Sequence, residues 1–229
     1  MRALKWMAAG VAAAAVGLGA YQLRVEAKPE AAAAARASAK EAVVKVVVFN
    51  KDGKLVGPVE SPRVTKSDDE WRKQLGPATF AVVRAKGTER PFCGTLLDNH
   101  KDGVYACVGC GLPLFASDAK FNSGTGWPSF FKPVGETNVA EDVDESHGMR
   151  RVEILCARCD SHLGHVFEDG PAPTGRRHCV NSESLKFFGK DELAKLADPA
   201  AEQPGAASAE KPAAAGAAAT RPATRPAGG

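Results

Sequence analysis

Six cysteines are the residues of this chain best suited to chemistry, and their spacing divides them into two kinds. Four of them form two Cys-x-x-Cys pairs, Cys107 with Cys110 and Cys156 with Cys159. The other two, Cys93 and Cys179, stand alone. A thiolate cage for a metal ion uses four sulfurs. The spacing therefore predicts one metal site with a structural role, and two further thiols that are free for redox chemistry.

The two Cys-x-x-Cys pairs have the features of facing zinc knuckles. The segment from Cys107 to Gly111 contains glycines where a knuckle needs a positive φ angle, and the second pair has the same spacing. Two facing knuckles give a tetrahedral set of four sulfurs, which suits Zn²⁺ and leaves no ligand position for a substrate. The alternative is a pair of disulfides, which an oxidising compartment would favour. We expect one structural Zn²⁺ per chain.

Cys179 lies in a basic and polar segment that begins at Arg176. The positive charges of Arg176, Arg177 and His178 are expected to lower the pKa of its thiol. On a strand, Arg177 and Asn181 share the face of Cys179, so Asn181 is the expected hydrogen-bond donor to it. The alternative is a buried free cysteine that acts only as a small apolar residue.

Two histidines and one tryptophan are the next candidates. His162 and His165 follow the second cysteine pair, and a glycine between them lets two rings at i and i+3 converge on one point. Such a ring can donate a proton or orient a substrate near neutral pH, and the alternative is an ordinary structural histidine. Trp127 follows a glycine-rich turn. It is either a core residue or part of an apolar wall for a small substituent.

The two ends of the chain differ from its centre. Arg2 and Lys5 precede an apolar stretch and a set of small residues, so residues 1–27 are predicted to be a signal peptide or an uncleaved membrane anchor. Residues 28–42 are predicted to be an alanine-rich linker, and residues 198–229 an Ala/Pro-rich disordered tail. We therefore expect export to the periplasm or cell envelope. The formal net charge of +3 argues against a nucleic-acid-binding protein.

The pattern at the centre of the chain predicts a mainly β fold. Residues 43–63 contain a β-branched run, a turn signal and a second short run, which indicate a β-hairpin extension. Residues 64–190 are the predicted main domain. Ser67 and Glu70 have the spacing of a capping box and predict a short helical N-terminal arm, which ends at the next Gly-Pro. Beyond it, short strand-like segments alternate with turns, so we expect two antiparallel sheets stapled by the four-cysteine zinc site.

Five segments of the main domain carry a resemblance to a known family. They are Cys107–Phe115, Ser123–Phe130, Ser146–Arg151, His162–Phe167 and Arg177–Ser182. Together and in this order they resemble the B-type methionine sulfoxide reductases, which are specific for the R epimer, and the match extends from about Val64 to Phe188. The resemblance implies an oxidoreductase that reduces methionine-R-sulfoxide, protein-bound or free, to methionine.

The resemblance also implies a role for each candidate residue. Cys179 is the expected nucleophile: its thiolate attacks the sulfoxide sulfur, methionine leaves, and a sulfenic acid remains. The sulfoxide oxygen must gain a proton for this attack to succeed, and His165 is the expected acid. His162 and Asn181 are expected to hold the oxygen or a bridging water. Trp127 is expected to form the pocket wall for the ε-methyl group.

The remaining implied roles concern Asp169, the paired cysteines and the recycling of the sulfenic acid. Asp169 is expected to orient a histidine in the substrate site, and the four paired cysteines match the zinc ligands of many relatives. Many relatives carry a resolving cysteine at the position of Thr125, and a threonine cannot form a disulfide. This chain has Cys93 instead, at a place that a minority of relatives use. We therefore expect a Cys179–Cys93 disulfide that a thioredoxin-like donor reduces. If the two sulfurs lie apart, either the Cys93 segment moves or a donor reduces the sulfenic acid directly.

The implied partners are oxidised proteins that carry methionine-R-sulfoxide and a thioredoxin-like reductant, and we expect a monomer. Two other function classes stay open from the residues alone. A non-catalytic zinc-stapled binding module would not need Cys179, His165 or Trp127. A cysteine–histidine hydrolase would need an oxyanion hole, for which the sequence has no motif.

Overall fold

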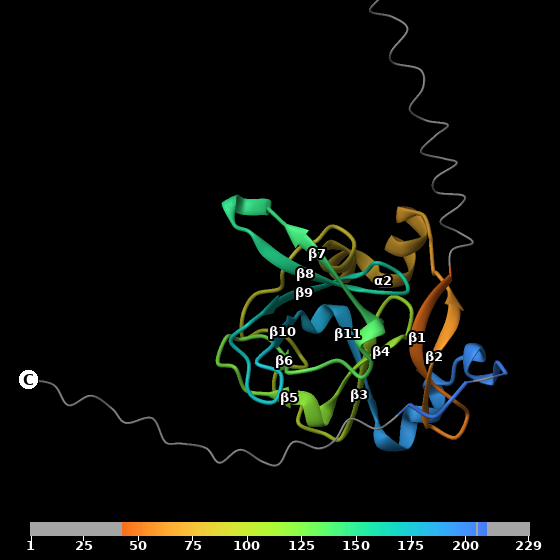
Figure 1. Cartoon of the computed structure of the whole chain (residues 1–229). Coiled ribbons are helices and arrows are strands. Elements are labelled where there is room, and N and C mark those ends of the chain that lie inside the picture. The colour runs from red at the N-terminus through yellow and green to blue at the C-terminus, as the bar shows by residue number, and fades with distance from the viewer. Residues whose placement is uncertain (1–42, 205, 210–229) are drawn as a thin grey trace, which may run out of the picture. The chain divides into compact units, whose positions relative to one another are not determined.

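The computed structural model describes residues 43–204 and 206–209, and Figure 1 shows how they are arranged. This part of the chain is mainly β, with antiparallel sheets and a helical arm, as the sequence predicted, and it also contains several 3-10 turns. No helix in the described ranges is both long and apolar enough to cross a membrane. The predicted signal or anchor at residues 1–27 and the predicted linker at residues 28–42 lie outside the described residues.

The strands form three antiparallel sheets. The two-stranded sheet pairs β1 (Val43–Phe49) with β2 (Leu55–Pro62). The three-stranded sheet has the order β11 (Leu185–Gly189), β3 (Gly103–Cys107) and β4 (Pro113–Ala116). The six-stranded sheet has the order β5 (Lys120–Phe121), β6 (Ser129–Phe130), β10 (Arg177–Val180), β9 (His162–Phe167), β8 (Arg151–Cys156) and β7 (Val139–Asp144). The 3-10 turns are η1 (Ser117–Ala119), η2 (Glu136–Asn138), η3 (Ser146–Gly148), η4 (Ser182–Ser184), η5 (Lys190–Leu196) and η6 (Pro199–Glu202).

The helical arm is α2 (Asp68–Val83), whose start and kink follow from the sequence, although the helix continues beyond the predicted end at Gly76-Pro77. The Ser67 hydroxyl accepts a hydrogen bond from the Glu70 amide at 3.3 Å, and the Ser67 amide donates to the Glu70 carboxylate at 2.8 Å. This is the predicted capping box. The helix kinks at Gly76, which has a φ of +74°, just before Pro77, so two helical pieces form. Trp71 from the first piece is buried in the main core.

The main core lies between the three-stranded and six-stranded sheets. Phe115 of β4 stacks on Phe130 of β6 with ring centroids 4.5 Å apart, and Tyr105 of β3 meets the same ring edge-on at 5.0 Å. Cys107, Cys156 and Cys159 belong to this cluster of buried residues. The cysteine pairs therefore sit inside the core, where they can hold the two sheets together.

One face of the six-stranded sheet carries a row of nucleophilic and titratable side chains. The register places Cys179 of β10 opposite His165 of β9. His165 in turn lies opposite Glu153 of β8, which lies opposite Asp142 of β7. Residues opposite each other in an antiparallel sheet share a face, so these four side chains form one row across four strands.

The tail of the chain is ordered further than the sequence predicted. Residues 198–204 and 206–209 are not disordered but fold onto the β1–β2 hairpin: the Gly57 amide donates a hydrogen bond to the Ala207 carbonyl at 2.9 Å, and the Asp198 amide donates to the Phe49 carbonyl at 2.9 Å. Asp198 also forms an ion pair with Arg158 of the second cysteine knuckle. Ala200 in η6 is buried. Alanine is small enough to fill a shallow site, so an alanine-rich composition did not exclude packing here. Residues 205 and 210–229 lie outside the described residues.

Candidate active site

The four paired cysteines form one cluster where β3 and β8 end. Their sulfurs all lie within 4.8 Å of one another, with 3.6 Å between Cys107 and Cys159 and 3.5 Å between Cys110 and Cys156. All four are free thiols, so neither pair forms a disulfide. A zinc ion with Zn–S bonds of about 2.3 Å would hold its sulfurs about 3.8 Å apart. The cluster therefore has the donor set and the size of a tetrathiolate site and could hold a metal ion.

Each knuckle is closed by a backbone hydrogen bond and a left-handed residue. The Gly111 amide donates to the Cys107 carbonyl at 2.8 Å, and Gly111 has a φ of +76°. In the second knuckle the Asp160 amide donates to the Cys156 carbonyl at 2.9 Å, with a φ of +56°. Gly109 serves a different purpose, because a Cβ atom there would lie 2.9 Å from a side chain of the other knuckle. The close packing of the two knuckles thus depends on a residue without a side chain.

The cage fixes the strand that carries both candidate histidines. β3 of the three-stranded sheet ends at Cys107, and β8 of the six-stranded sheet ends at Cys156. The next strand, β9, begins at His162, shortly after Cys159. A metal bound to these sulfurs would therefore tie the two sheets together and hold the start of β9 in place.

A small cleft of about 130 Å³ opens at the row of chemical residues on the six-stranded sheet. It is lined by Thr88, Trp127, Arg151, Gly164, His165, Phe167, Cys179, Val180 and Asn181. The structure thus places Cys179, His165, Trp127 and Asn181 around one space. His162 is not among the lining residues, but its ring centroid lies 5.6 Å from that of His165.

A bulge in β9 explains how the two histidines converge. In a regular strand, residues at i and i+3 point to opposite faces. The β8–β9 register shifts between Ile154 and Leu155, which leaves one extra residue in β9 between His162 and Gly164. Gly164 is required at this point because a Cβ atom there would lie 2.0 Å from the carbonyl oxygen of Cys179. The glycine between the histidines therefore permits both the bulge and the close approach of β10.

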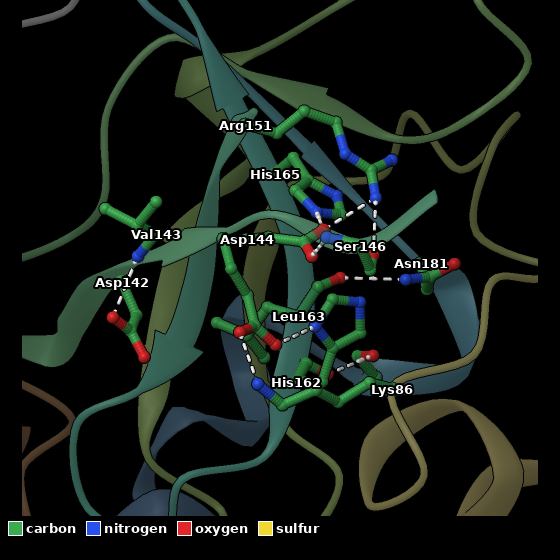
Figure 2. Close-up of polar contacts among 12 residues, drawn as sticks. Lys86, Asp142, Val143, Asp144, Ser146, Arg151, His162, Leu163, His165 and Asn181 are labelled. Carbon is green, nitrogen blue, oxygen red and sulfur yellow. Dashed lines mark hydrogen bonds and ion pairs between the residues drawn. The ribbon is translucent and has the colours of Figure 1, made fainter. Parts of the chain in front are cut away.

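Asp144 holds His165 and is itself held by Arg151, and no local sequence pattern pointed to either residue. Figure 2 shows Asp144 between the His165 ring and the Arg151 guanidinium. Its carboxylate lies 2.8 Å from His165 Nε2 and 2.6 Å from Arg151 Nη2. Hydrogen bonds from Ser146, and then those from His165 and Arg151, hold the pKa of Asp144 well below its usual range. Asp144 ends β7 and Arg151 begins β8, so the β7–β8 hairpin brings a fixed negative charge to the candidate acid.

Asp169 does not have the predicted contact with a histidine. Its carboxylate instead forms a two-point ion pair with Arg177, at 2.8 Å from Nε and 2.9 Å from Nη2. The residue that contacts the His165 ring is Asp144, from a different strand pair. The resemblance suggested Asp169 for this role, whereas the six-stranded sheet brings β7 beside β8 and lets the last residue of β7 reach the ring.

The indole of Trp127 and the amide of Asn181 are both fixed by Glu89, a residue that the sequence analysis missed. Trp127 Nε1 donates to the Glu89 carbonyl at 3.1 Å, and the Glu89 amide donates to Asn181 Oδ1 at 3.1 Å. Asn181 Nδ2 donates to the Leu163 carbonyl at 3.1 Å. Asn181 was expected to donate to the Cys179 sulfur, but the polar group near that sulfur is the Thr125 hydroxyl, at 3.9 Å.

The electrostatic environment of Cys179 also differs from the prediction. Burial raises the pKa of its thiol, and the charge of Arg177 offsets only part of this effect. Arg176 contributes little because its guanidinium pairs with Glu141 at 2.5 Å. His178 points to the opposite face, where its Nδ1 lies 3.2 Å from the Phe130 carbonyl. Of the three positive neighbours in sequence, only Arg177 faces the sulfur, as alternation along a strand requires.

The raised pKa predicts a pH dependence of alkylation in the free protein. The thiolate is the reactive form, so the rate at Cys179 with iodoacetamide should rise with pH and level off only above the ordinary thiol pKa of about 8.5. Arg177→Met removes the positive charge that lowers the pKa of the Cys179 thiol. The curve of alkylation rate against pH should therefore shift to still higher pH. Arg176→Met is the matched control and should leave the curve unchanged. Peptide mass spectrometry can follow Cys179 with the exposed Cys93 as an internal reference, and a plateau reached below pH 7 would contradict the assigned environment.

The fold and the site define a mainly β protein, braced by a four-cysteine cage, with a thiol and an imidazole in one small cleft. The sequence model of the SelR domain family matches residues 75–189, which is half of the chain. The chain therefore belongs to this family.

Curated relatives show which members of the family the chain is similar to. It is 56% identical over 136 residues to a peptide methionine sulfoxide reductase MsrB from Hahella chejuensis, a match that covers 59% of this chain and 98% of the relative. It is 57% identical over 125 residues to a protein of the same name from Bradyrhizobium diazoefficiens, covering 55% of this chain and 90% of the relative. A third relative of that name, from Methanosarcina barkeri, is 56% identical over 129 residues, or 56% of this chain and 91% of the relative. The chain is thus a member of a family of oxidoreductases.

Proposed function

We propose that this protein reduces methionine-R-sulfoxide, free or in oxidised proteins, to methionine through Cys179. The observation that carries the proposal is the single cleft shared by Cys179, His165 and Trp127. A passive zinc-stapled module would have no reason to bring these three residues together. A space of about 130 Å³ suits the methyl sulfoxide end of one side chain rather than a large ligand. The test is turnover of the two separated epimers with dithiothreitol, compared between the wild-type chain and Cys179→Ser.

In the first step the Cys179 sulfur attacks the sulfur of the sulfoxide, and the sulfur–oxygen bond breaks. A sulfur–sulfur bond forms in this attack, and the protonated oxygen leaves as water. A water molecule then cleaves the sulfur–sulfur bond, which releases methionine and leaves a sulfenic acid on Cys179. Overall a thiol and a sulfoxide become a sulfenic acid and a thioether, with no net change in protons. His165 supplies a proton to the oxygen during the attack, and Asp144 holds its ring in place. Trp127 forms the wall beside the ε-methyl group, and Asn181 with His162 holds the oxygen or a bridging water.

In the second step Cys93 resolves the sulfenic acid. Its thiol condenses with the sulfenic acid on Cys179, a sulfur–sulfur bond forms and water leaves. Both residues are free thiols, and Cys93 is exposed. Its neighbour Phe92 donates a hydrogen bond to the Gly126 carbonyl at 2.8 Å, next to Thr125, whose hydroxyl lies against the Cys179 sulfur. This contact supports a short path between the thiols. Since Cys93 does not line the cleft, its segment must move for the bond to form.

The Cys93→Ser variant should lose turnover driven by a thioredoxin-type donor and still form about one equivalent of methionine per chain, because the first step needs only Cys179. Chromatographic measurement of methionine, with and without thioredoxin and its reductase, checks both the loss of turnover and the single equivalent of methionine. Dithiothreitol is the control, since a small thiol can reach the sulfenic acid directly and should restore turnover. Full thioredoxin-driven turnover in the variant would assign the resolving role elsewhere.

Three further features belong to the same proposal. Zn²⁺ is the metal that the four thiolates suit, with a structural role. The electron donor is a thioredoxin-like dithiol, because an exposed intramolecular disulfide is the form that such a protein reduces. Export of the chain is also part of this proposal, and it rests on the character of the first residues, Arg2 and Lys5 before an apolar stretch.

A further inference from the structure

Lys86, Glu153 and His162 form a chain of polar contacts behind the cleft, and two of the three have no task in the reaction described so far. Glu153 Oε1 lies 2.6 Å from His162 Nδ1, and Glu153 Oε2 lies 2.6 Å from Lys86 Nζ. Glu153 and His162 are each only 2% exposed. A carboxylate buried to this degree is costly unless both of its oxygens have partners, and here both do.

These contacts decide which ring nitrogen of His162 carries the hydrogen. A carboxylate accepts hydrogen bonds and has none to donate, so the hydrogen in the contact with Glu153 must sit on Nδ1. A neutral imidazole has only one N–H, which leaves Nε2 with a lone pair. Burial lowers the pKa of His162, an effect that the charges of His165 and Lys86 reinforce and that Glu153 opposes. The ring is therefore neutral near pH 7, and Nε2 is an acceptor.

Nε2 of His162 has no hydrogen-bond partner among the residues that the structure describes, although it is fully buried. Figure 2 shows the His162 ring beside the ring of His165, whose centroid lies 5.6 Å away and which lines the cleft. An unpaired buried acceptor is destabilising. Its position therefore suits an O–H donor from the cleft, either a water molecule or the sulfoxide oxygen once that oxygen has been protonated.

We infer that Glu153 and Lys86 are positioning residues, which hold His162 in the Nδ1–H form so that its Nε2 accepts a hydrogen bond from an O–H group at the site. The inference rests on the proposed reductase function. It also separates the roles of the two histidines. His162 has no hydrogen on Nε2 to give, so it holds the oxygen or water after the transfer. His165 is the donor, and because its Nε2–H points to the Asp144 carboxylate, it gives a hydrogen carried on Nδ1.

The direct test is the tautomer of His162 in the full-length, metal-loaded wild-type chain. Long-range ¹H–¹⁵N spectra of histidine-labelled protein, assigned with His162→Gln, distinguish a protonated from an unprotonated ring nitrogen. We expect a protonated Nδ1 and an unprotonated Nε2 between pH 7 and pH 8. A hydrogen on Nε2, or a doubly protonated ring at pH 7, would overturn the inference. This measurement needs no variant of the network and no substrate.

Two variants test the consequence for the reaction. Glu153→Gln is isosteric, but its amide can donate to Nδ1 and so move the ring hydrogen to Nε2. Its single-turnover rate of methionine formation should fall at least about tenfold, with little change in substrate affinity. Lys86→Met should slow the same step and raise the pKa of His162 in the ¹⁵N titration, because a positive charge that faces the ring is removed. Lys86→Arg keeps that charge and should restore both the single-turnover rate and the pKa of His162 to their wild-type values.

The control is Lys190→Met, which breaks a surface ion pair of the same 2.6 Å length with Asp102 and should leave the rate unchanged. A wild-type rate in Glu153→Gln with an altered tautomer would overturn the positioning role. If the wild-type chain itself reduced neither epimer, the proposed function would fail, while the tautomer would still report whether the assignment of the ring hydrogen is correct.

Discussion

The Cys179→Ser variant should lose at least about 1,000-fold in the rate of methionine-R-sulfoxide reduction with dithiothreitol, which corresponds to about 4 kcal/mol in the barrier. The physical reason is that the reaction forms a bond between the attacking atom and the sulfoxide sulfur. A serine hydroxyl is a far weaker nucleophile than a thiolate at any pH at which the protein is folded. No other sulfur among the described residues lines the cleft, so none can replace it.

Chromatographic separation of methionine from the two sulfoxide epimers measures this effect. Serine is close to cysteine in size, and Cys179 is not one of the cage sulfurs, so the variant should keep the wild-type melting temperature and metal content. Cys93→Ser is the matched control, because it also removes a free thiol and should keep turnover with dithiothreitol. Reduction that survives in Cys179→Ser would mean that the nucleophile is a different group.

The second large effect is expected from Cys159→Ser, which removes one sulfur of the buried cage. A serine hydroxyl is a poor ligand for zinc, so the site should lose its metal. Structural zinc contributes roughly 10–16 kcal/mol of apparent binding free energy, whereas a whole domain is stable by roughly 5–15 kcal/mol. We therefore expect the variant to be largely unfolded or to melt far below the wild-type chain, and to be inactive for that reason.

Metal analysis and thermal unfolding followed by circular dichroism check this prediction. The wild-type chain should contain one zinc ion, and Cys93→Ser should contain the same amount because Cys93 lies outside the cage. The activity of the variant should fall in proportion to the fraction of folded protein that is lost. A Cys159→Ser chain that contained no zinc and yet melted at the wild-type temperature would show that the cage does not support the fold.

The two effects are connected through the start of β9. His162 follows the second knuckle within a few residues, and its position depends on the bulge that Gly164 permits. The same strand carries His165, which lies opposite Cys179. Loss of the cage would therefore release the element that sets the distance between the acid and the nucleophile.

The features that the sequence predicted correctly are those that depend on neighbours along the chain. Ser67 and Glu70 are three residues apart, so their capping box could be recognised without any knowledge of the rest of the fold. The Cys-x-x-Cys spacing in the same way encodes a knuckle, and alternation along a strand placed Arg177 on the face of Cys179. The resemblance added which cysteine, histidine and tryptophan would meet, and the structure places Cys179, His165 and Trp127 around one cleft.

The features that the sequence could not supply depend on pairing between distant segments. Asp144 reaches His165 because β7, β8 and β9 are neighbours in one sheet, and Lys86 reaches Glu153 across 67 positions of chain. Asp169, which is nearer to His165 in sequence, pairs with Arg177 instead. Local charge suggested an acidic thiol at Cys179, whereas burial, which is set by the packing of the whole domain, raises its pKa. Residue types and short spacings thus determined the chemistry available to this chain. The tertiary structure decided the partners and the protonation of each group, because register and burial arise only when distant strands pack together.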